Sequence, residues 1–316
     1  MDQTRRTFIK NVTTAAAGLP LLKWMESAEI AGTSTNFPIA FFTKPLDDYE
    51  LDFMLEVLAG AGLDGLDLSV RPGGRVEPSH IQEQLPFVVE AAKHHGLKTE
   101  MMVSAITSAN EPLVNEVLKT AAEVGVKHYR LGYFKYEANE MVPELERIRK
   151  AMAGLAVVNE RVGIQGGYQN HTGKNFGSPM WDLWEVLRQI PSHSVSSQFD
   201  IRHAVTEGAN SWELAMRLLH ERIGSLAIKD FTWGVSGHEA KVVGTPLGEG
   251  IVNFDAFFSI LKEKNISAPI TLHIEYPLLS DSEKGLSLSQ QRKILTEKIK
   301  KDVDFIRHGL AKFNLT

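Results

Sequence analysis

The chain has no cysteine in its 316 residues. Disulfide bonds, thiolate nucleophiles and cysteine-type zinc sites are therefore excluded. The chain also lacks an excess of positive charge, because 39 Asp and Glu outnumber 34 Lys and Arg and give a formal net charge of −5. Proteins that hold a nucleic-acid backbone need a basic surface. We therefore expect no nucleic-acid partner.

Internal boundaries are scarce as well. After the first few dozen residues, no Pro/Ser-rich linker, block of like charge or low-complexity run divides the sequence. The hydrophobic content of 43% is typical of a globular protein. A chain of this length can bury roughly three quarters of the surface that its unfolded state exposes. One large α/β domain is the simplest prediction.

The N-terminus has the pattern of a targeting segment. Residues 4–10 (TRRTFIK) contain the paired arginines, apolar residue and closing lysine of a twin-arginine signal. The mildly apolar run at residues 12–22 is shorter than the roughly 20 residues that span a bilayer, and it suits the h-region of an export signal. We predict that residues 1–31 form this signal and a linker, that the mature protein is periplasmic, and that it has no stable membrane insertion after signal removal. An ordinary basic amphipathic N-terminus is the alternative.

Short apolar runs alternate with amphipathic ones from residue 36 to residue 312, which is the pattern of parallel βα units. We predict strands at residues 37–42, 65–70, 97–103, 126–131, 162–169, 194–200, 223–228 and 270–274. We predict helices at residues 48–61, 81–95, 112–124, 143–159, 181–189, 211–222, 255–265 and 289–310. The Gly-rich stretch at residues 232–251 is predicted to be a long excursion. A single-domain (β/α)8 TIM barrel fits better than an open doubly wound sheet, because no Gly-x-Gly-x-x-Gly turn follows any strand.

Polar side chains of the kinds that bind ligands stand where several of these strands end. Asp200 ends the sixth strand, and His203 follows three positions later, where the strand should give way to a loop. Gln169 ends the fifth strand and Glu275 ends the eighth. Because the carboxyl ends of barrel strands meet at one mouth, we expect these side chains to lie together. Taken alone, Asp200 and His203 also suit a helix-capping acid with a solvated histidine.

The predicted mouth combines oxygen, imidazole and amine groups from strand ends and loops. Its members are Gln169, Asp200, His203, Lys229 and Glu275, with Lys135, His171, Arg202 and His238 on adjoining loops. Oxygen and imidazole donors grouped in this way suit a divalent cation such as Mn, Co, Ni, Zn or Mg. The predicted metal ligands are Gln169, Asp200, His203 and Glu275. A hydrogen-bonded polar cluster without a metal is the alternative.

Together, the eight units, the Asp-x-x-His of Asp200 and His203, the YQNH sequence closing the fifth strand, and Glu275 resemble the sugar phosphate isomerase/epimerase group of xylose isomerase-like TIM barrels. The resemblance implies a metal held by acidic residues that end strands five, six and eight and by a histidine that ends strand seven, while the histidine of Asp-x-x-His contacts the metal or the substrate. Asp200, His203 and Glu275 match this pattern. Gln169 stands where the family usually has a glutamate, and Ala227 stands where a histidine is common.

The resemblance also implies a reaction. It is divalent-metal-assisted abstraction of an α-proton from a keto sugar, in which the cation polarises the carbonyl and stabilises an enediolate. The family typically uses two metal-linked glutamates for proton transfer, but the amide of Gln169 cannot act as a general base. The residues expected to carry proton transfer are therefore Glu275, Lys229, His203 and His171. The residues expected to contact the sugar are Arg202, His238, Lys135, His273 and Trp233, whose ring could stack on a pyranose or simply pack against the barrel.

Other functions stay open. A metal-dependent lyase or dehydratase acting on 3-keto sugars or 3-keto-glycosides needs one base and one acid, which suits the replacement of a glutamate by Gln169. A catalytically inactive carbohydrate-binding barrel is suggested by Gln169 and Ala227. The net charge of −5 counts against an endonuclease of the related metal-dependent type. A homo-oligomer is also left open.

Overall fold

A computed structural model describes residues 37–137 and 139–315 of the chain. The predicted export signal and linker at residues 1–31 lie outside this part of the chain. The described residues belong to one compact unit. None of the helices among them combines the length and apolar character needed to span a lipid bilayer.

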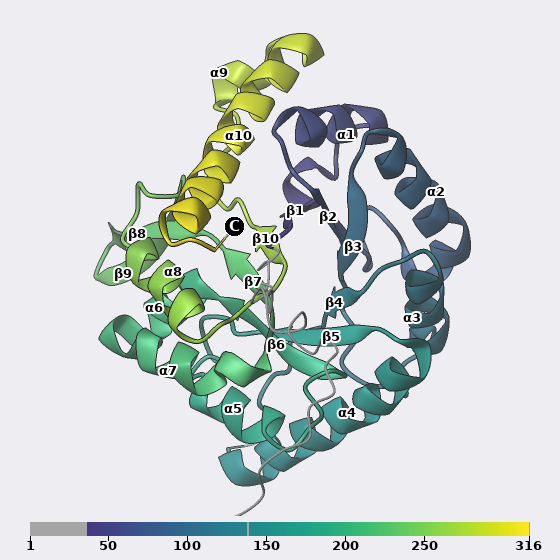
Figure 1. The fold of residues 1–316 in the computed structure, drawn as a ribbon, viewed down its shortest axis with the longest axis vertical. Coiled ribbons are helices and arrows are strands. Elements are labelled where there is room, and N and C mark those ends of the chain that lie inside the picture. Colours follow the sequence, from purple (N-terminus) through teal and green to yellow (C-terminus); the bar gives the residue numbers. More distant parts are fainter. Residues whose placement is uncertain (1–36, 138, 316) are drawn as a thin grey trace, which may run out of the picture. The chain divides into compact units, whose positions relative to one another are not determined.

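Eight parallel strands close into a barrel (Figure 1), which confirms the predicted fold class. They are β1 (Ile39–Phe42), β2 (Gly65–Ser69), β3 (Lys98–Val103), β4 (His128–Arg130), β5 (Gln165–Gln169), β6 (Val195–Asp200), β7 (Ile223–Ile228) and β10 (Ile270–Leu272). Each strand pairs with the next barrel strand along the chain, and β10 pairs with β1 to close the ring. The carboxyl ends of all eight strands therefore point to the same rim.

The helices surround the ring of strands (Figure 1). They are α1 (Leu51–Gly60), α2 (Ile81–His94), α3 (Val114–Glu123), α4 (Met141–Val162), α5 (Trp181–Leu187), α6 (Ile201–Gly208), α7 (Trp212–Leu219), α8 (Phe254–Glu263), α9 (Asp281–Lys284) and α10 (Leu288–Lys312). Single turns of 3-10 helix occur at Lys44–Leu46, Pro78–His80, Ala209–Ser211 and His220–Arg222. The longer helices lie where helices were predicted, whereas α6, the short α9 and the 3-10 turns at Lys44–Leu46, Pro78–His80 and Ala209–Ser211 were not predicted.

Helix α4 shows how the sequence sets these elements. Ile148, Met152 and Leu155 recur at helical spacing and are buried against the barrel. The helix ends at Gly163, which adopts a φ of 77° in the left-handed region that favours glycine. The helix is longer than predicted at both ends, by the exposed Met141 and Val142 at its start and by Glu160, Arg161 and Val162 at its end.

The chain after β6 differs from the prediction of a loop. Helix α6 begins directly after Asp200, whose side chain accepts a hydrogen bond from the backbone N–H of His203 at 3.0 Å. This is the N-capping role that the sequence left as an alternative. His203 is not solvated, however, because its ring is buried. The cap fixes Asp200 and His203 at the rim on one rigid element.

The predicted Gly-rich excursion contains an antiparallel hairpin of β8 (Asp230–Ser236) and β9 (Glu239–Thr245). Gly237 and His238 form its turn, and Gly237 has a φ of 64°, as two-residue hairpin turns with glycine at this position require. The base of the hairpin packs beside the chain that follows β10. A Cβ added at Gly244 would lie 2.6 Å from the backbone carbonyl oxygen of Glu275.

The two faces of β6 separate core from site. All six of its residues are buried. Val195 and Phe199 belong to the hydrophobic core. Gln198 and Asp200 alternate with them, so these buried polar side chains face the barrel interior.

Candidate active site

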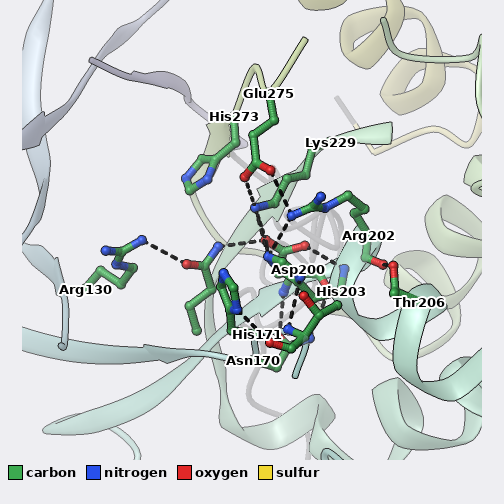
Figure 2. Close-up of polar contacts among 12 residues, drawn as sticks. Arg130, Asn170, His171, Asp200, Arg202, His203, Thr206, Lys229, His273 and Glu275 are labelled. Carbon is green, nitrogen blue, oxygen red and sulfur yellow. Dashed lines mark hydrogen bonds and ion pairs between the residues drawn. The ribbon is translucent and has the colours of Figure 1, made fainter. Parts of the chain in front are cut away.

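Lys229, which directly follows β7, is the centre of a polar network at the carboxyl rim (Figure 2). Its side chain is only 3% exposed. Its Nζ atom lies 3.0 Å from Asp200 Oδ2 and 2.7 Å from Glu275 Oε1. The same Nζ lies 3.1 Å from His203 Nε2. The acid that ends β6 and the acid that follows β10 therefore contact a common atom, and that atom is an ammonium nitrogen.

Arg202 adds a second cation from the first turn of α6. Its Nη2 atom lies 2.9 Å from Glu275 Oε2 and 3.0 Å from His203 Nε2. Figure 2 shows Arg202 and Lys229 approaching the carboxylate of Glu275 from their separate elements. Each carboxylate oxygen of Glu275 thus has its own cation. The Glu275 side chain is nevertheless 43% exposed, so it is the member of the network that a bound molecule can reach.

Asp200 is fixed from both the backbone and the side chain. Asn170 donates to the Asp200 carbonyl at 2.9 Å and accepts from the Asp200 N–H at 2.8 Å. The amide nitrogen of Gln169 donates to Asp200 Oδ2 at 2.6 Å. These bonds leave Asp200 a single orientation beside Lys229.

Gln169 has its amide orientation determined by its partners. Its Oε1 accepts from Arg130 Nη1 at 2.9 Å and from the Tyr133 hydroxyl at 2.5 Å. Because Arg130 can only donate and the Asp200 carboxylate can only accept, Oε1 faces the former and Nε2 the latter. Arg130 was not predicted from the sequence. The signal that could have found it is the alternation of polar His128 and Arg130 around apolar Tyr129 in a buried strand.

The two rim carboxylates are ionised. Burial alone would raise the pKa of Asp200, but the charges of Lys229 and Arg202 hold that pKa below its ordinary value. The same balance acts on Glu275, whose pKa is also lowered by these two cations against the effect of burial. A carboxylate at Glu275 is therefore available to accept a proton at neutral pH.

The two histidines beside this network are neutral. Burial and then the charges of Lys229 and Arg202 hold the pKa of His203 well below its ordinary value. Burial also lowers the pKa of His171, whose ring lies 4.1 Å from that of His203 between centroids. His171 Nδ1 donates to the carbonyl oxygen of Thr172 at 2.9 Å, so its Nε2 is the nitrogen that carries the lone pair.

A second group of polar side chains lies deeper in the barrel. Asp67 Oδ2 accepts from Thr271 Oγ1 at 2.8 Å and lies 3.8 Å from His273 Nε2. Among the described residues, neither Asp67 Oδ1 nor His273 Nε2 has a hydrogen-bond partner. Burial raises the pKa of Asp67 to about 6 and lowers that of His273 well below its ordinary value. Asp67 was not predicted as a site residue, although its parity on β2 places it inside the barrel.

Three of the predicted substrate-binding residues lie apart from this network. Lys135 is exposed in the loop after β4, and His238 is exposed at the tip of the hairpin. The Trp233 ring is 46% exposed and packs edge-on against Phe231 with centroids 5.3 Å apart. Within residues 37–137 and 139–315, none of the three forms a hydrogen bond or ion pair with the network around Lys229.

A profile of the xylose isomerase-like TIM barrel family matches residues 55–307. The chain belongs to this family. Similar solved structures of these barrels include D-psicose 3-epimerase from Clostridium cellulolyticum H10, at 13% identity, 87% coverage of this chain, 99% of that chain and a TM-score of 0.64. D-allulose 3-epimerase from Methylomonas sp. has 17% identity, 87% and 99% coverage and a TM-score of 0.63. 3-keto-D-glucoside 4-epimerase from E. coli has 14% identity, 83% and 99% coverage and a TM-score of 0.60. These likenesses show the shared fold. No match was found among curated protein sequences.

In this xylose isomerase-like barrel, the predicted metal ligands do not fit a divalent cation. Within the described part of the chain, no three or more His, Asp or Glu side chains are arranged as a metal site with Lys229 in place. Gln169 turns its amide nitrogen toward Asp200, and its oxygen is already bonded twice. Ala227 is the register partner of Asp200 on β7 and offers no donor. The ammonium of Lys229 lies between Asp200 and Glu275 and would repel a cation there.

Proposed function

We propose that this barrel is a sugar isomerase or epimerase that removes a proton next to the carbonyl of a keto sugar and forms an enediolate. The observation that carries the proposal is the half-exposed, ionised carboxylate of Glu275, held 2.7 Å from Lys229 Nζ and 2.9 Å from Arg202 Nη2. A base beside two fixed cations is what formation of an oxyanion needs. The family membership and the sugar epimerases that share the fold support a carbohydrate substrate.

The proposed steps balance with groups on the chain. The Glu275 carboxylate takes the α-proton, the C–H electron pair forms a carbon–carbon double bond, and the carbonyl π pair moves to oxygen. Lys229 and Arg202 face the negative charge that develops on that oxygen. A proton returned to the former carbonyl carbon gives an isomer when the α-hydroxyl proton also passes to the former carbonyl oxygen, and a proton returned to the original carbon from the opposite face gives an epimer.

His171 is the proposed second proton-transfer group. It is neutral, partly exposed and has its basic nitrogen at Nε2. Gln169 cannot serve, because its amide accepts no proton at neutral pH. To return a proton, His171 must first take one at Nε2 from a substrate hydroxyl or from solvent, so the two faces of the substrate meet chemically different groups.

The use of one carboxylate and one imidazole as the two proton-transfer groups also favours a second candidate function, β-elimination from a 3-keto sugar or 3-keto-glycoside. In that reaction the same enediolate expels an oxygen leaving group, to which one acid gives a proton, and no second carboxylate is needed. The amide at Gln169 is the observation that supports it. We further propose that residues 1–31 direct the protein to the periplasm by the twin-arginine route, where phosphorylated metabolites are scarce, so that the substrate carries no phosphate.

Solvent deuterium exchange tests the proposed function. Keto sugars named for the neighbouring epimerases, together with 3-keto-glucosides, are incubated with the protein in deuterated water and followed by proton NMR. We expect loss of the α-hydrogen signal, with carbon count and water content of the product separating isomer from elimination product. Glu275→Gln should slow exchange by roughly 100-fold or more.

The matched control is Glu263→Gln. Glu263 lies on α8 at the outer surface, is 45% exposed and pairs with Arg217 Nη2 at 2.9 Å, much as Glu275 pairs with Arg202. This control should exchange at the wild-type rate. Sugar binding without any exchange by the wild type would instead support the carbohydrate-binding barrel.

A further inference from the structure

We propose that the ammonium of Lys229 takes the place of a divalent cation between Asp200 and Glu275, so that the site works without a metal ion. The inference rests on the proposed function for its catalytic meaning, but its structural claim about metal binding stands separately. Its starting observation is that one Nζ atom contacts Asp200 Oδ2, Glu275 Oε1 and His203 Nε2 at 3.0, 2.7 and 3.1 Å. Two carboxylates and an imidazole are ligands that a metal would use.

Charge balance supports the replacement. Asp200 and Glu275 contribute two negative charges, and Lys229 and Arg202 contribute two positive charges within ion-pair distance. The network is therefore neutral as it stands. A divalent ion added to it would leave a buried excess of two positive charges, which proteins avoid unless the charges are paired.

The other residues around Lys229 Nζ also offer no free ligand atom for a metal ion. The Gln169 oxygen is occupied by Arg130 and Tyr133, and both of these partners are donors. Ala227 lies in register with Asp200 and has only a methyl group. A cation that displaced Lys229 would gain no third anionic ligand from these positions.

A fixed ammonium can also respond to proton transfer. When Glu275 takes the substrate proton, its carboxylate becomes neutral and its ion pairs with Lys229 and Arg202 weaken. The positive charge of these two residues is then free to stabilise the enediolate oxygen formed in the same step. Negative charge thus passes from the base to the intermediate beside cations that do not move far.

The first experiment measures metal binding by the wild-type full chain. The protein is stripped with EDTA, exposed to Mn²⁺ and desalted, and bound manganese is measured by elemental analysis and by electron paramagnetic resonance. We expect substoichiometric manganese and no shift in Tm on adding Mn²⁺. One tightly bound equivalent would overturn the inference.

The second experiment removes the ammonium. Lys229→Met leaves Asp200, Glu275 and His203 facing one another, so Mn²⁺ should now bind and raise the Tm of the variant, because a ligand that binds only the folded state stabilises it. Adding Asp200→Asn to this variant should abolish the gain. If Lys229→Met does not fold with or without Mn²⁺, the wild-type measurement alone decides.

The matched control is Lys312→Met. Lys312 forms an ion pair of 2.7 Å with Asp255 on the outside of the barrel, and its side chain is 51% exposed. Its loss should produce no Mn²⁺ response. A response equal to that of Lys229→Met would show adventitious binding and overturn the inference.

The failures of the two proposals are distinguishable. If the deuterium exchange survives EDTA, both stand. If exchange is lost with EDTA and restored by Mn²⁺, the proposed function stands and metal-free operation is wrong. If no keto sugar exchanges and the wild type binds no manganese, the proposed function is wrong while the assignment of Lys229 to the cation position stands.

Discussion

Asp200 and Asp67 are two fully buried acids inside the same barrel, and they differ in their partners. Asp200 contacts Lys229, and its pKa is lowered. Asp67 has a threonine hydroxyl and a neutral histidine beside it, and its pKa is raised to about 6. Burial is the same for both, so the difference comes from the partners, chiefly the charges of Lys229 and Arg202 close to Asp200. The rim of the barrel is thus built for charge, and its deeper layer is built to hold neutral groups.

The largest expected effect comes from removing the cation that makes this difference. Lys229→Met should lower the free energy of unfolding by roughly 3–5 kcal/mol, because it leaves a buried carboxylate without its partner. Urea unfolding in metal-free buffer measures the loss. The surface control Lys312→Met should lose no more than about 1 kcal/mol. Equal losses in the two variants would show that Asp200 does not depend on Lys229.

Removing the negative charge of the deeper acid, Asp67, should stabilise the protein. The pKa of Asp67 is raised from an ordinary 3.8 to about 6, so the folded state binds more protons than the unfolded state between these values. The free energy of unfolding therefore falls as pH rises through this window, by roughly 3 kcal/mol once the pH exceeds the folded pKa.

Asp67→Asn should remove this loss. Its free energy of unfolding should exceed that of the wild type above pH 6 and approach it well below pH 3.8, where Asp67 is protonated in both states. Urea unfolding at both pH values checks the sign. A variant less stable than the wild type above pH 6 would show that ionised Asp67 has a stabilising partner.

A smaller effect should appear in the pH dependence of exchange. The pKa of His171 lies below 6.5, so the neutral base is present above that value and is lost as pH falls through the lowered pKa. We expect a constant exchange rate above pH 6.5 and a fall of roughly tenfold for each pH unit below the lowered pKa. In His171→Gln this acid-side fall of the pH–rate profile should be absent. A rate that already falls above pH 6.5 would assign the second proton-transfer role to a group other than His171.

The smallest effect is expected far from the rim. His94 lies at the end of α2, with its side chain 73% exposed and Nε2 3.5 Å from Glu90. His94→Ala should change the free energy of unfolding by no more than about 0.5 kcal/mol and leave the exchange rate unchanged. A large effect on exchange would mean that rates in this protein do not report on the rim.

The sequence was sufficient to predict the barrel and the strand ends that form its mouth. Asp200 and Glu275 follow apolar runs, and strand periodicity places such residues at one rim. The pairing of these acids with Lys229 could not be predicted, because it depends on side-chain reach across three strands. Helix α6 was missed because Asp200 serves both as the end of β6 and as a helix cap, and Arg130 was missed because its partner Gln169 is 39 residues away in the chain.

The most direct test of a lysine-filled cation position is a crystal structure of the wild-type protein soaked in Mn²⁺, with data collected at the manganese absorption edge. We expect Lys229 Nζ within hydrogen-bond distance of Asp200 and Glu275 and no anomalous density between the two carboxylates. An anomalous peak there, with the Lys229 side chain displaced, would contradict the assignment.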